Sequence, residues 1–242
     1  EITGNSNKGV DGTVQNLGTI NYSGARLFVG LNQSVPGVLD NEGVFNALGD
    51  GDLTFNFDHA GHRFRNTGTL NKSGESETRI NFPFDNSGPV DVQQGTFRMD
   101  AGGDHTGSFK STGTGDLHFQ GGTHTLQDTG SITGETVSTA GATVHVDGSY
   151  QVVQTNISAG ALNLNRDTTT TLNLTNGNLG GSGQVTLNGD SSWAAGAMVG
   201  AGTTLIESGA VMNVSSNSNK GIDRTLRNLG TINYSGARLF VG

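Results

Sequence analysis

The chain has 242 residues, with 40 Gly, 3 Pro, no Cys and a formal net charge of −8. A chain of this charge lacks the clustered Lys and Arg that hold nucleic acid or anionic lipid, and the lack of cysteine excludes disulfides and thiolate-bound metals. The longest run of small apolar residues, 194–202, is too short to cross a bilayer. We therefore expect neither nucleic acid nor membrane insertion for this segment.

A long repeat is the first feature in chain order. Residues 5–30, NSNKGVDGTVQNLGTINYSGARLFVG, return almost unchanged as 217–242, NSNKGIDRTLRNLGTINYSGARLFVG. Self-similarity at a fixed period is the signature of an array of stacked units. We expect residues 1–242 to be one continuous part of a longer protein, with 5–216 as one full period and 217–242 as the start of the next, a copy of 5–30.

A shorter motif recurs inside this period. It reads Asn-x-Gly, then a residue such as Thr or Val, an apolar residue, and Asn or Asp. Four copies follow one another at nearly regular intervals in the first part of the chain and begin at Asn16, Asn41, Asn66 and Asn86. A fifth copy begins at Asn228 and belongs to the second copy of the long repeat. A unit of about 20 to 25 residues is therefore repeated, with glycine at its turns.

The segments between these turns predict β-strands. Apolar residues alternate with polar ones, as in Leu162–Leu164, Leu172–Leu174 and Val185–Leu187, and no segment has a helical period. Pairs such as Asn176-Gly177 and Asn188-Gly189 leave antiparallel hairpins possible. The equivalence of units at the length of one coil favours instead a parallel β-helix, an all-β solenoid of about 10–12 coils.

Stacked coils place like residues above like. We predict a column of asparagine amides hydrogen-bonded along the stack, with glycine supplying a left-handed backbone at each bend. The alternative is that these asparagines are isolated turn formers. The predicted structural positions are Asn16, Gly18, Asn41, Gly43, Asn66, Gly68, Asn86, Gly88, Asn228 and Gly230.

A narrow core and four surface loops complete the predicted fold. The loops are 33–37, 58–61, 73–77 and 100–104, where polar residues surround Gly or Pro. The expected core consists of the apolar residues of the alternating runs: Ile20, Leu27, Val29, Val44, Phe55, Phe57, Leu70, Phe97, Leu117, Phe119, Leu126, Val144, Val146, Leu162, Leu164, Leu172, Leu174, Val185, Leu187, Leu205, Val211 and Ile232.

Four stretches carry a family resemblance: RNLGTINYSGARLFVG (227–242), FDNSGPVDVQQGTFRMDAGG (84–103), LHFQGGTHTL (117–126) and SSWAAGAMVGAGTTLIESGAVMNV (191–214). They resemble the Gly- and Asn-rich β-helical repeats of giant bacterial cell-surface proteins, such as filamentous-haemagglutinin-like adhesins and autotransporter passengers. The resemblance implies that the β-helix is right-handed. It also implies a secreted, extracellular structural or adhesive segment of a bacterial surface fibre, stalk or sheath. Its partners would be identical or homologous repeats stacked end to end, and glycans of a host cell, matrix or surface.

An enzyme of the same fold is the alternative, because parallel β-helices also bind or cleave polysaccharides. Asp50, Asp52 and Asp58 lack the second carboxylate cluster that a glycosidase needs. Gly61-His62-Arg63 only partly matches the Gly-His-Gly of pectin-cleaving hydrolases. We therefore expect a non-catalytic protein without cofactors.

The histidines and the single tryptophan have modest expected roles. His59 and His62, like His118 and His124, could approach one another, but each pair lacks a third metal ligand. We interpret all four as loop or surface residues and expect no metal site. Trp193 lies in a Gly/Ala-rich context, which favours packing in the core or a bend over stacking on a sugar.

Overall fold

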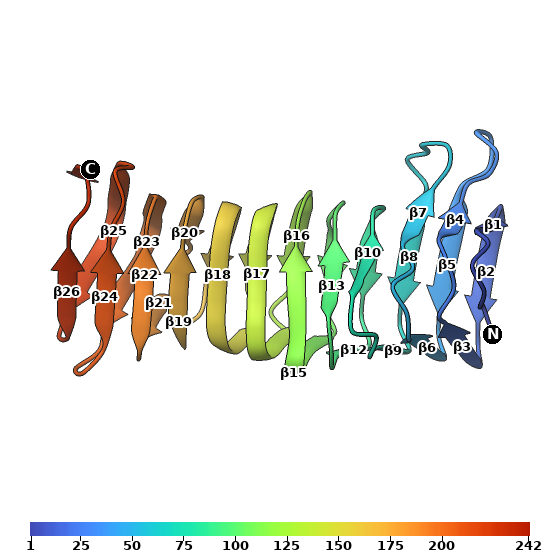
Figure 1. The fold of residues 1–242 in the computed structure, drawn as a ribbon, viewed down its shortest axis with the longest axis horizontal. Coiled ribbons are helices and arrows are strands. Elements are labelled where there is room, and N and C mark those ends of the chain that lie inside the picture. The colour runs from blue at the N-terminus through green and yellow to red at the C-terminus, as the bar shows by residue number, and fades with distance from the viewer.

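The computed structural model describes residues 1–242 as a rod of stacked β-coils (Figure 1). All 27 strands belong to one sheet system in which every paired strand runs parallel to its partner, and the coils make about 12 turns. The predicted all-β solenoid is confirmed. The chain contains no helix, and hence none that could cross a membrane.

Each coil crosses three faces in turn, and strands of the same face pair from coil to coil. The first face consists of β1 (Lys8–Val10), β4 (Leu27–Val29), β7 (Leu53–Phe55), β10 (Glu77–Ile80), β13 (Thr96–Met99), β22 (Asp190–Trp193), β24 (Val211–Val214) and β26 (Thr231–Tyr234), with parts of β15 and β17–β19.

The second face follows the first in every coil. It consists of β2 (Gly12–Asn16), β5 (Gly37–Asn41), β8 (Arg63–Asn66), β11 (Phe84–Asn86), β14 (Gly103–His105), β16 (Thr123–Leu126), β20 (Asn178–Gly180) and β27 (Leu239–Val241), with parts of β17, β18, β23 and β25.

The third face closes the coil. It consists of β3 (Thr19–Tyr22), β6 (Val44–Ala47), β9 (Thr69–Lys72), β12 (Pro89–Val92) and β21 (Gln184–Leu187), with parts of the long strands that bend round corners. These long strands are β15 (Ser108–Phe119), β17 (Ser131–Val146), β18 (Ser149–Leu164), β19 (Thr168–Leu174), β23 (Gly196–Ile206) and β25 (Lys220–Asn228).

The coils differ in length because their corners differ. Gln154 pairs with Thr171 in a short coil, whereas Leu53 pairs with the more distant Ile80 in a long one. The extra residues of the long coils form loops, and the segments after β4 and after β7 project furthest from the rod (Figure 1). They include the predicted loops 33–37 and 58–61, although Gly37 already belongs to β5. The faces therefore stay in register while the corners absorb insertions.

The core changes composition along the rod. In the first coils it is an aromatic stack, with ring centroids 6.0 Å apart for Tyr22 and Phe45 and 5.4 Å apart for Phe45 and Phe64. Towards the C-terminus it is aliphatic, with residues such as Leu162 and Leu187 fully buried. Because alternate residues of a strand point to opposite faces, one apolar side chain in two is enough to fill so narrow an interior.

Several residues predicted for the core lie elsewhere. Phe57 is 38% exposed in a projecting loop. Val44, Leu205 and Val211 are only half-buried because Phe45, Ile206 and Met212, their chain neighbours, take the inward positions. Wherever two adjacent residues are both apolar, alternation alone does not decide which one faces inward. Ile20, Phe55 and Ile232 pack against the core while partly buried; the remaining predicted residues are buried, as expected.

Candidate functional site

The asparagines of four successive coils form one column at the corner between the second and third faces. Asn16 donates its amide to Asn41 at 2.6 Å, Asn41 donates to Asn66 at 2.6 Å, and Asn66 donates to Asn86 at 2.8 Å. All four side chains are buried. Each amide thus meets an identical group one coil away, and its polar atoms need no water.

The backbone at this corner explains why the amides align. The carbonyl oxygen of Asn16 accepts hydrogen bonds from the N–H groups of both Glu42 and Gly43, at 2.9 and 2.8 Å. The second amide hydrogen of Asn16 goes to the carbonyl of Val44, at 2.9 Å. Side chain and main chain therefore clamp each corner onto the next coil, and Asn supplies both a donor and an acceptor at the required length.

The glycines of the motif have a different role from the one predicted. Gly18, Gly43, Gly68 and Gly88 do not have positive φ, so the expected left-handed bend is wrong. A Cβ on Gly43 would overlap the carbonyl oxygen of Gly18, and one on Gly68 would overlap the carbonyl oxygen of Gly43. Glycine is needed here because consecutive coils approach each other too closely for a side chain.

The motif of the second copy lies at a different corner. Asn228 ends β25 between the third and first faces, pairs with Ile206, and is exposed. Gly230 follows it, where a Cβ would meet the carbonyl oxygen of Ala210. The structure brings together Asn16, Asn41, Asn66 and Asn86, but it does not bring Asn228 into their column.

Sequence reasoning missed the fifth member of the column. His105 pairs with Asn86 in the register of β11 and β14, and it is buried. Its Nε2 lies 3.1 Å from Nδ1 of His124, whose own Nε2 lies 3.1 Å from the carbonyl oxygen of Gly121. His105 marks the point where the polar column ends, because Leu126 follows it in the next coil. The only sequence signal was its position shortly before Gly107.

Burial keeps this histidine pair neutral. It lowers the pKa of His105 to about 3, assisted by repulsion from His124, and burial also lowers the pKa of His124 to about 4. The two rings stack with centroids 5.4 Å apart. One neutral imidazole can donate to the other, whereas protonation would place a cation in the core, with Nδ1 of His105 already lacking a partner.

Two further histidines show where the surface interpretation fails and where it holds. His62 is buried; its Nδ1 accepts a hydrogen bond from the N–H of Gly37 at 2.9 Å, and its Nε2 lies 2.8 Å from the carbonyl oxygen of Phe57. It fastens a projecting loop to the rod, which the surface interpretation did not foresee. His118 faces outward, away from His124, and the hydrogen bond that it donates to the carboxylate of Asp116 raises its pKa.

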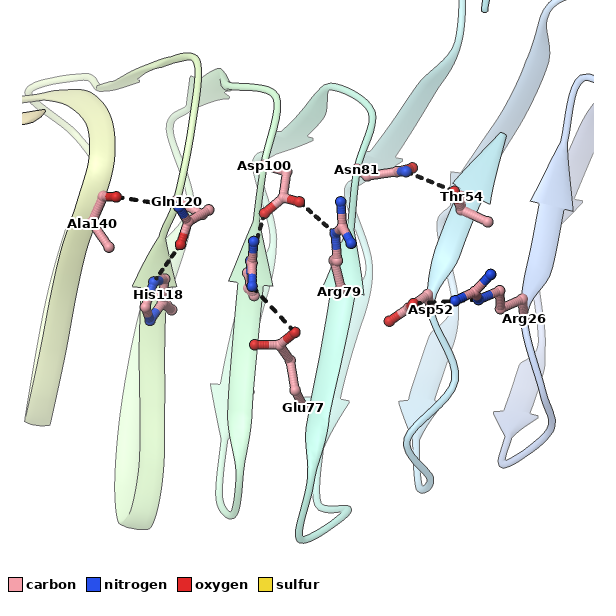
Figure 2. Close-up of polar contacts among 11 residues, drawn as sticks. Arg26, Asp52, Thr54, Glu77, Arg79, Asn81, Asp100, His118, Gln120 and Ala140 are labelled. Atoms are coloured by element: carbon pink, nitrogen blue, oxygen red, sulfur yellow. Dashed lines mark hydrogen bonds and ion pairs between the residues drawn. The ribbon is translucent and has the colours of Figure 1, made fainter. Parts of the chain in front are cut away.

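Carboxylates on the first face are held by arginines of neighbouring coils (Figure 2). Asp100 accepts from both Arg79 and Arg98, and Arg98 also lies 3.5 Å from Glu77. Asp52, one of the acidic residues considered for catalysis, lies 3.6 Å from Arg26. Arg98 and Asp100 belong to the same coil, whereas the other pairs join one coil to the next in addition to the backbone ladder.

One outward column of the same face consists of uncharged polar residues further along the rod. Beyond His118, the outward column continues through Ser138, Asn156, Asn173 and Ser192. Ser192 donates to Asn173 at 2.6 Å. The outer surface thus carries a second column of polar side chains, which are half-buried and less regularly hydrogen-bonded than the buried asparagines.

Two large side chains stay in the core. Trp193 is buried and donates its indole N–H to the carbonyl of Ala195 at 3.1 Å, in line with the predicted packing role. Lys72 is buried as well, and its Nζ reaches the carbonyl of Gly74 at a corner; burial lowers its pKa. No three His, Asp or Glu side chains gather as a metal-binding group.

Comparison with known proteins finds no relative. No protein-family model matches the chain, and no curated protein or solved structure matches it. The geometry of the solenoid is therefore the basis for any functional conclusion.

Proposed function

We propose that the chain is a non-catalytic structural segment of a bacterial extracellular surface fibre, stalk or adhesin, extended by stacking copies of its own repeat. The supporting observation is that the second copy of the motif continues the parallel ladders of the coils before it. β26 pairs with β24 and β27 pairs with β25, just as β3 pairs with β6 and β4 with β7 in the first copy. The repeat thus stacks on the end of the preceding repeat in the way that successive coils stack within it.

The first copy shows how a following coil covers the motif. β3 is covered by β6, β2 by β5 and β4 by β7, through continuous parallel ladders. A chain that continued with the same sequence would therefore bury the second copy in the same way. The parallel ladders would then continue from one repeat into the next without interruption. Such growth is the property that a stalk requires, because each coil contacts only its neighbours.

The outer surface supports the same proposal. The carboxylates of Asp40, Asp52, Asp85 and Asp100 all contact an arginine of another coil, which favours a role in joining coils. An adhesive function would depend on exposed side chains, and its ligand would be a glycan or a protein of the attached surface. Secretion and attachment to a bacterial cell are taken from the family resemblance.

The experiment is to produce chains with one, two and three copies of the repeat 5–216 and to measure particle length by electron microscopy. At ~4.8 Å per coil, each added repeat of roughly ten coils lengthens the rod by about 50 Å. Globular particles, or a length independent of repeat number, would contradict the proposal. Incubation with a panel of acidic polysaccharides tests the alternative: new reducing ends or unsaturated products would identify a polysaccharide-cleaving enzyme.

A further inference from the structure

The two copies of the motif lie on different faces of the solenoid. In the first copy, β1 lies on the first face, where it pairs with β4. The equivalent residues 220–223 of β25 lie on the second face, where they pair with residues 196–199 of β23. In the same way, β3 lies on the third face, but its equivalent β26 pairs with β24 on the first. The motif has advanced by one face.

The number of strand segments explains this advance. Followed from β1, the chain makes ten complete coils of three segments and one further segment before it reaches residue 220. A repeat that is not a whole number of coils cannot return to the face on which it began. Translation along the rod alone therefore does not superpose the two copies, and a rotation by one face is also required.

The motif keeps two of its local contacts despite the change of face. The N–H of Gly18 donates to the side-chain oxygen of Asn16 at 3.3 Å, and the N–H of Gly230 donates to that of Asn228 at 3.1 Å. Lys220 donates its Nζ to the carbonyl of Ser218 at 2.9 Å, just as the equivalent Lys8 donates to the carbonyl of Ser6 at 2.8 Å. The corner between β1 and β2 differs, because Gly12 has a φ of +80° whereas its equivalent Arg224 lies within the continuous strand β25.

We infer that the solenoid accepts a following copy of its own repeat in one orientation only, turned by one face about the rod axis. This inference rests on the proposed array. The interaction surface is the coil formed by β25–β27, and the partner is the next repeat. Three consecutive repeats then present any outward-facing feature on the three faces in turn, and the fourth repeat returns to the first face.

The asparagine column illustrates the consequence. The column that starts at Asn16 occupies the corner between the second and third faces, and the one that would start at Asn228 occupies the corner between the third and first. Asn228 lies above Ile206, so a new polar column begins on an apolar one. The asparagine columns of successive repeats therefore occupy the corners of the rod in turn. Without the rotation, every repeat would place its column at the same corner.

Disulfide trapping tests the orientation in the present chain, which has no cysteine of its own. Asn213 and Asn233 are exposed neighbours on the first face, and their amides lie 3.0 Å apart. If β26 instead repeated the position of β3 on the third face, Asn233 would lie beside Leu205. Adjacent parallel strands place Cα atoms about 5 Å apart, within the range that a disulfide bridges.

We expect the double variant N213C/N233C to form an intramolecular disulfide on mild oxidation and L205C/N233C to form none, as scored by mass spectrometry after thiol blocking. Circular dichroism of each reduced variant checks that the chain is folded. A disulfide in L205C/N233C, or none in folded N213C/N233C, would overturn the rotation. The proposed stalk would survive that result, because it depends on particle length and not on orientation.

Discussion

At the residue scale, the buried asparagine amides depend closely on their hydrogen-bond partners. Replacing Asn66 by Ala removes the bond from Asn41 and the bond to Asn86, and it leaves polar groups buried without partners. Because each such group costs about 1–3 kcal/mol, we expect Asn66→Ala to lower the free energy of unfolding by roughly 2–4 kcal/mol. Urea denaturation followed by circular dichroism measures this loss.

Asn56 offers a matched control, since it is exposed in the loop after β7 and lies outside the column. Asn56→Ala should change stability by less than about 0.5 kcal/mol. Equal effects of the two substitutions would show that the column makes no special contribution to stability.

The histidine pair predicts a pH dependence of stability. The pKa values of His105 and His124 in the folded state, about 3 and about 4, lie below the ordinary value of 6.5. The unfolded chain therefore binds protons first as the pH falls. Stability is full above pH 6.5 and is lost below it, by roughly 1.4 kcal/mol per pH unit and histidine, until the folded-state pKa is reached.

The double variant His105→Asn/His124→Leu isolates this contribution. Asn continues the column below it, and Leu matches Val144 in the next coil. Between pH 6.5 and 4.5, the unfolding free energy of the variant should fall less steeply than that of the parent, by up to about 5 kcal/mol in total. Parallel pH profiles would mean that both histidines are already protonated, or exposed, in the folded protein.

At the element scale, the corner glycines test how closely the coils approach. Ala at position 68 would force its Cβ onto the carbonyl of Gly43, whereas Ala at position 18 meets no atom within 4 Å. Neither residue has positive φ, so the two substitutions differ only in the space available. We expect Gly68→Ala to cost about 1–3 kcal/mol and Gly18→Ala to cost little. Thermal unfolding of both variants provides the measurement, and equal melting temperatures would contradict the close-contact role.

Two leucines of neighbouring strands test the assignment of inner and outer positions. Leu187 of β21 is fully buried, while Leu205 of β23 points to the other side of the wall and is half-buried. A carboxylate buried without a partner costs several kcal/mol, so Leu187→Asp should unfold its coil and the adjoining ones together. Leu205→Asp should leave the rod folded. Hydrogen exchange of the neighbouring strands distinguishes local from cooperative loss.

Sequence reasoning succeeded where the spacing of a motif equals the length of a coil. Asn16 and Asn41 are one motif interval apart in the sequence and are also partners in the strand register, so the column could be predicted from the motif. His105 could not, because a single histidine carries no periodic signal. The role of the glycines was misjudged because contact between coils is a property of the stack, which the local turn rules do not describe.

At the scale of the whole molecule, the face on which a repeat begins could not be read from its length. Coils of unequal length follow one another, so a repeat as long as 5–216 fits several numbers of strand segments. The number is fixed by how many residues each corner contains, and this differs from coil to coil. The repeat itself was evident from the sequence, while its rotation required the register of every coil.

The last coil predicts how separate molecules associate. β26 and β27 have unpaired edges and exposed apolar side chains, among them Leu239 and Val241, and an exposed strand edge is a template for another chain. We expect the segment 1–242, when it is produced on its own, to associate head to tail in a heterologous contact that need not close. The weight-average mass in sedimentation equilibrium should therefore rise with protein concentration.

A charged edge should prevent this association without unfolding the rod. The double variant Leu239→Lys/Val241→Lys places two cations on β27, where both side chains are exposed at the open end of the rod, so the monomer should keep its circular dichroism spectrum and remain monomeric. Val153→Lys is the matched control, because Val153 is 58% exposed on the side of the rod and not at its end. If the side variant abolished association and the edge variant did not, molecules would associate laterally, and the edge strands would not be the contact.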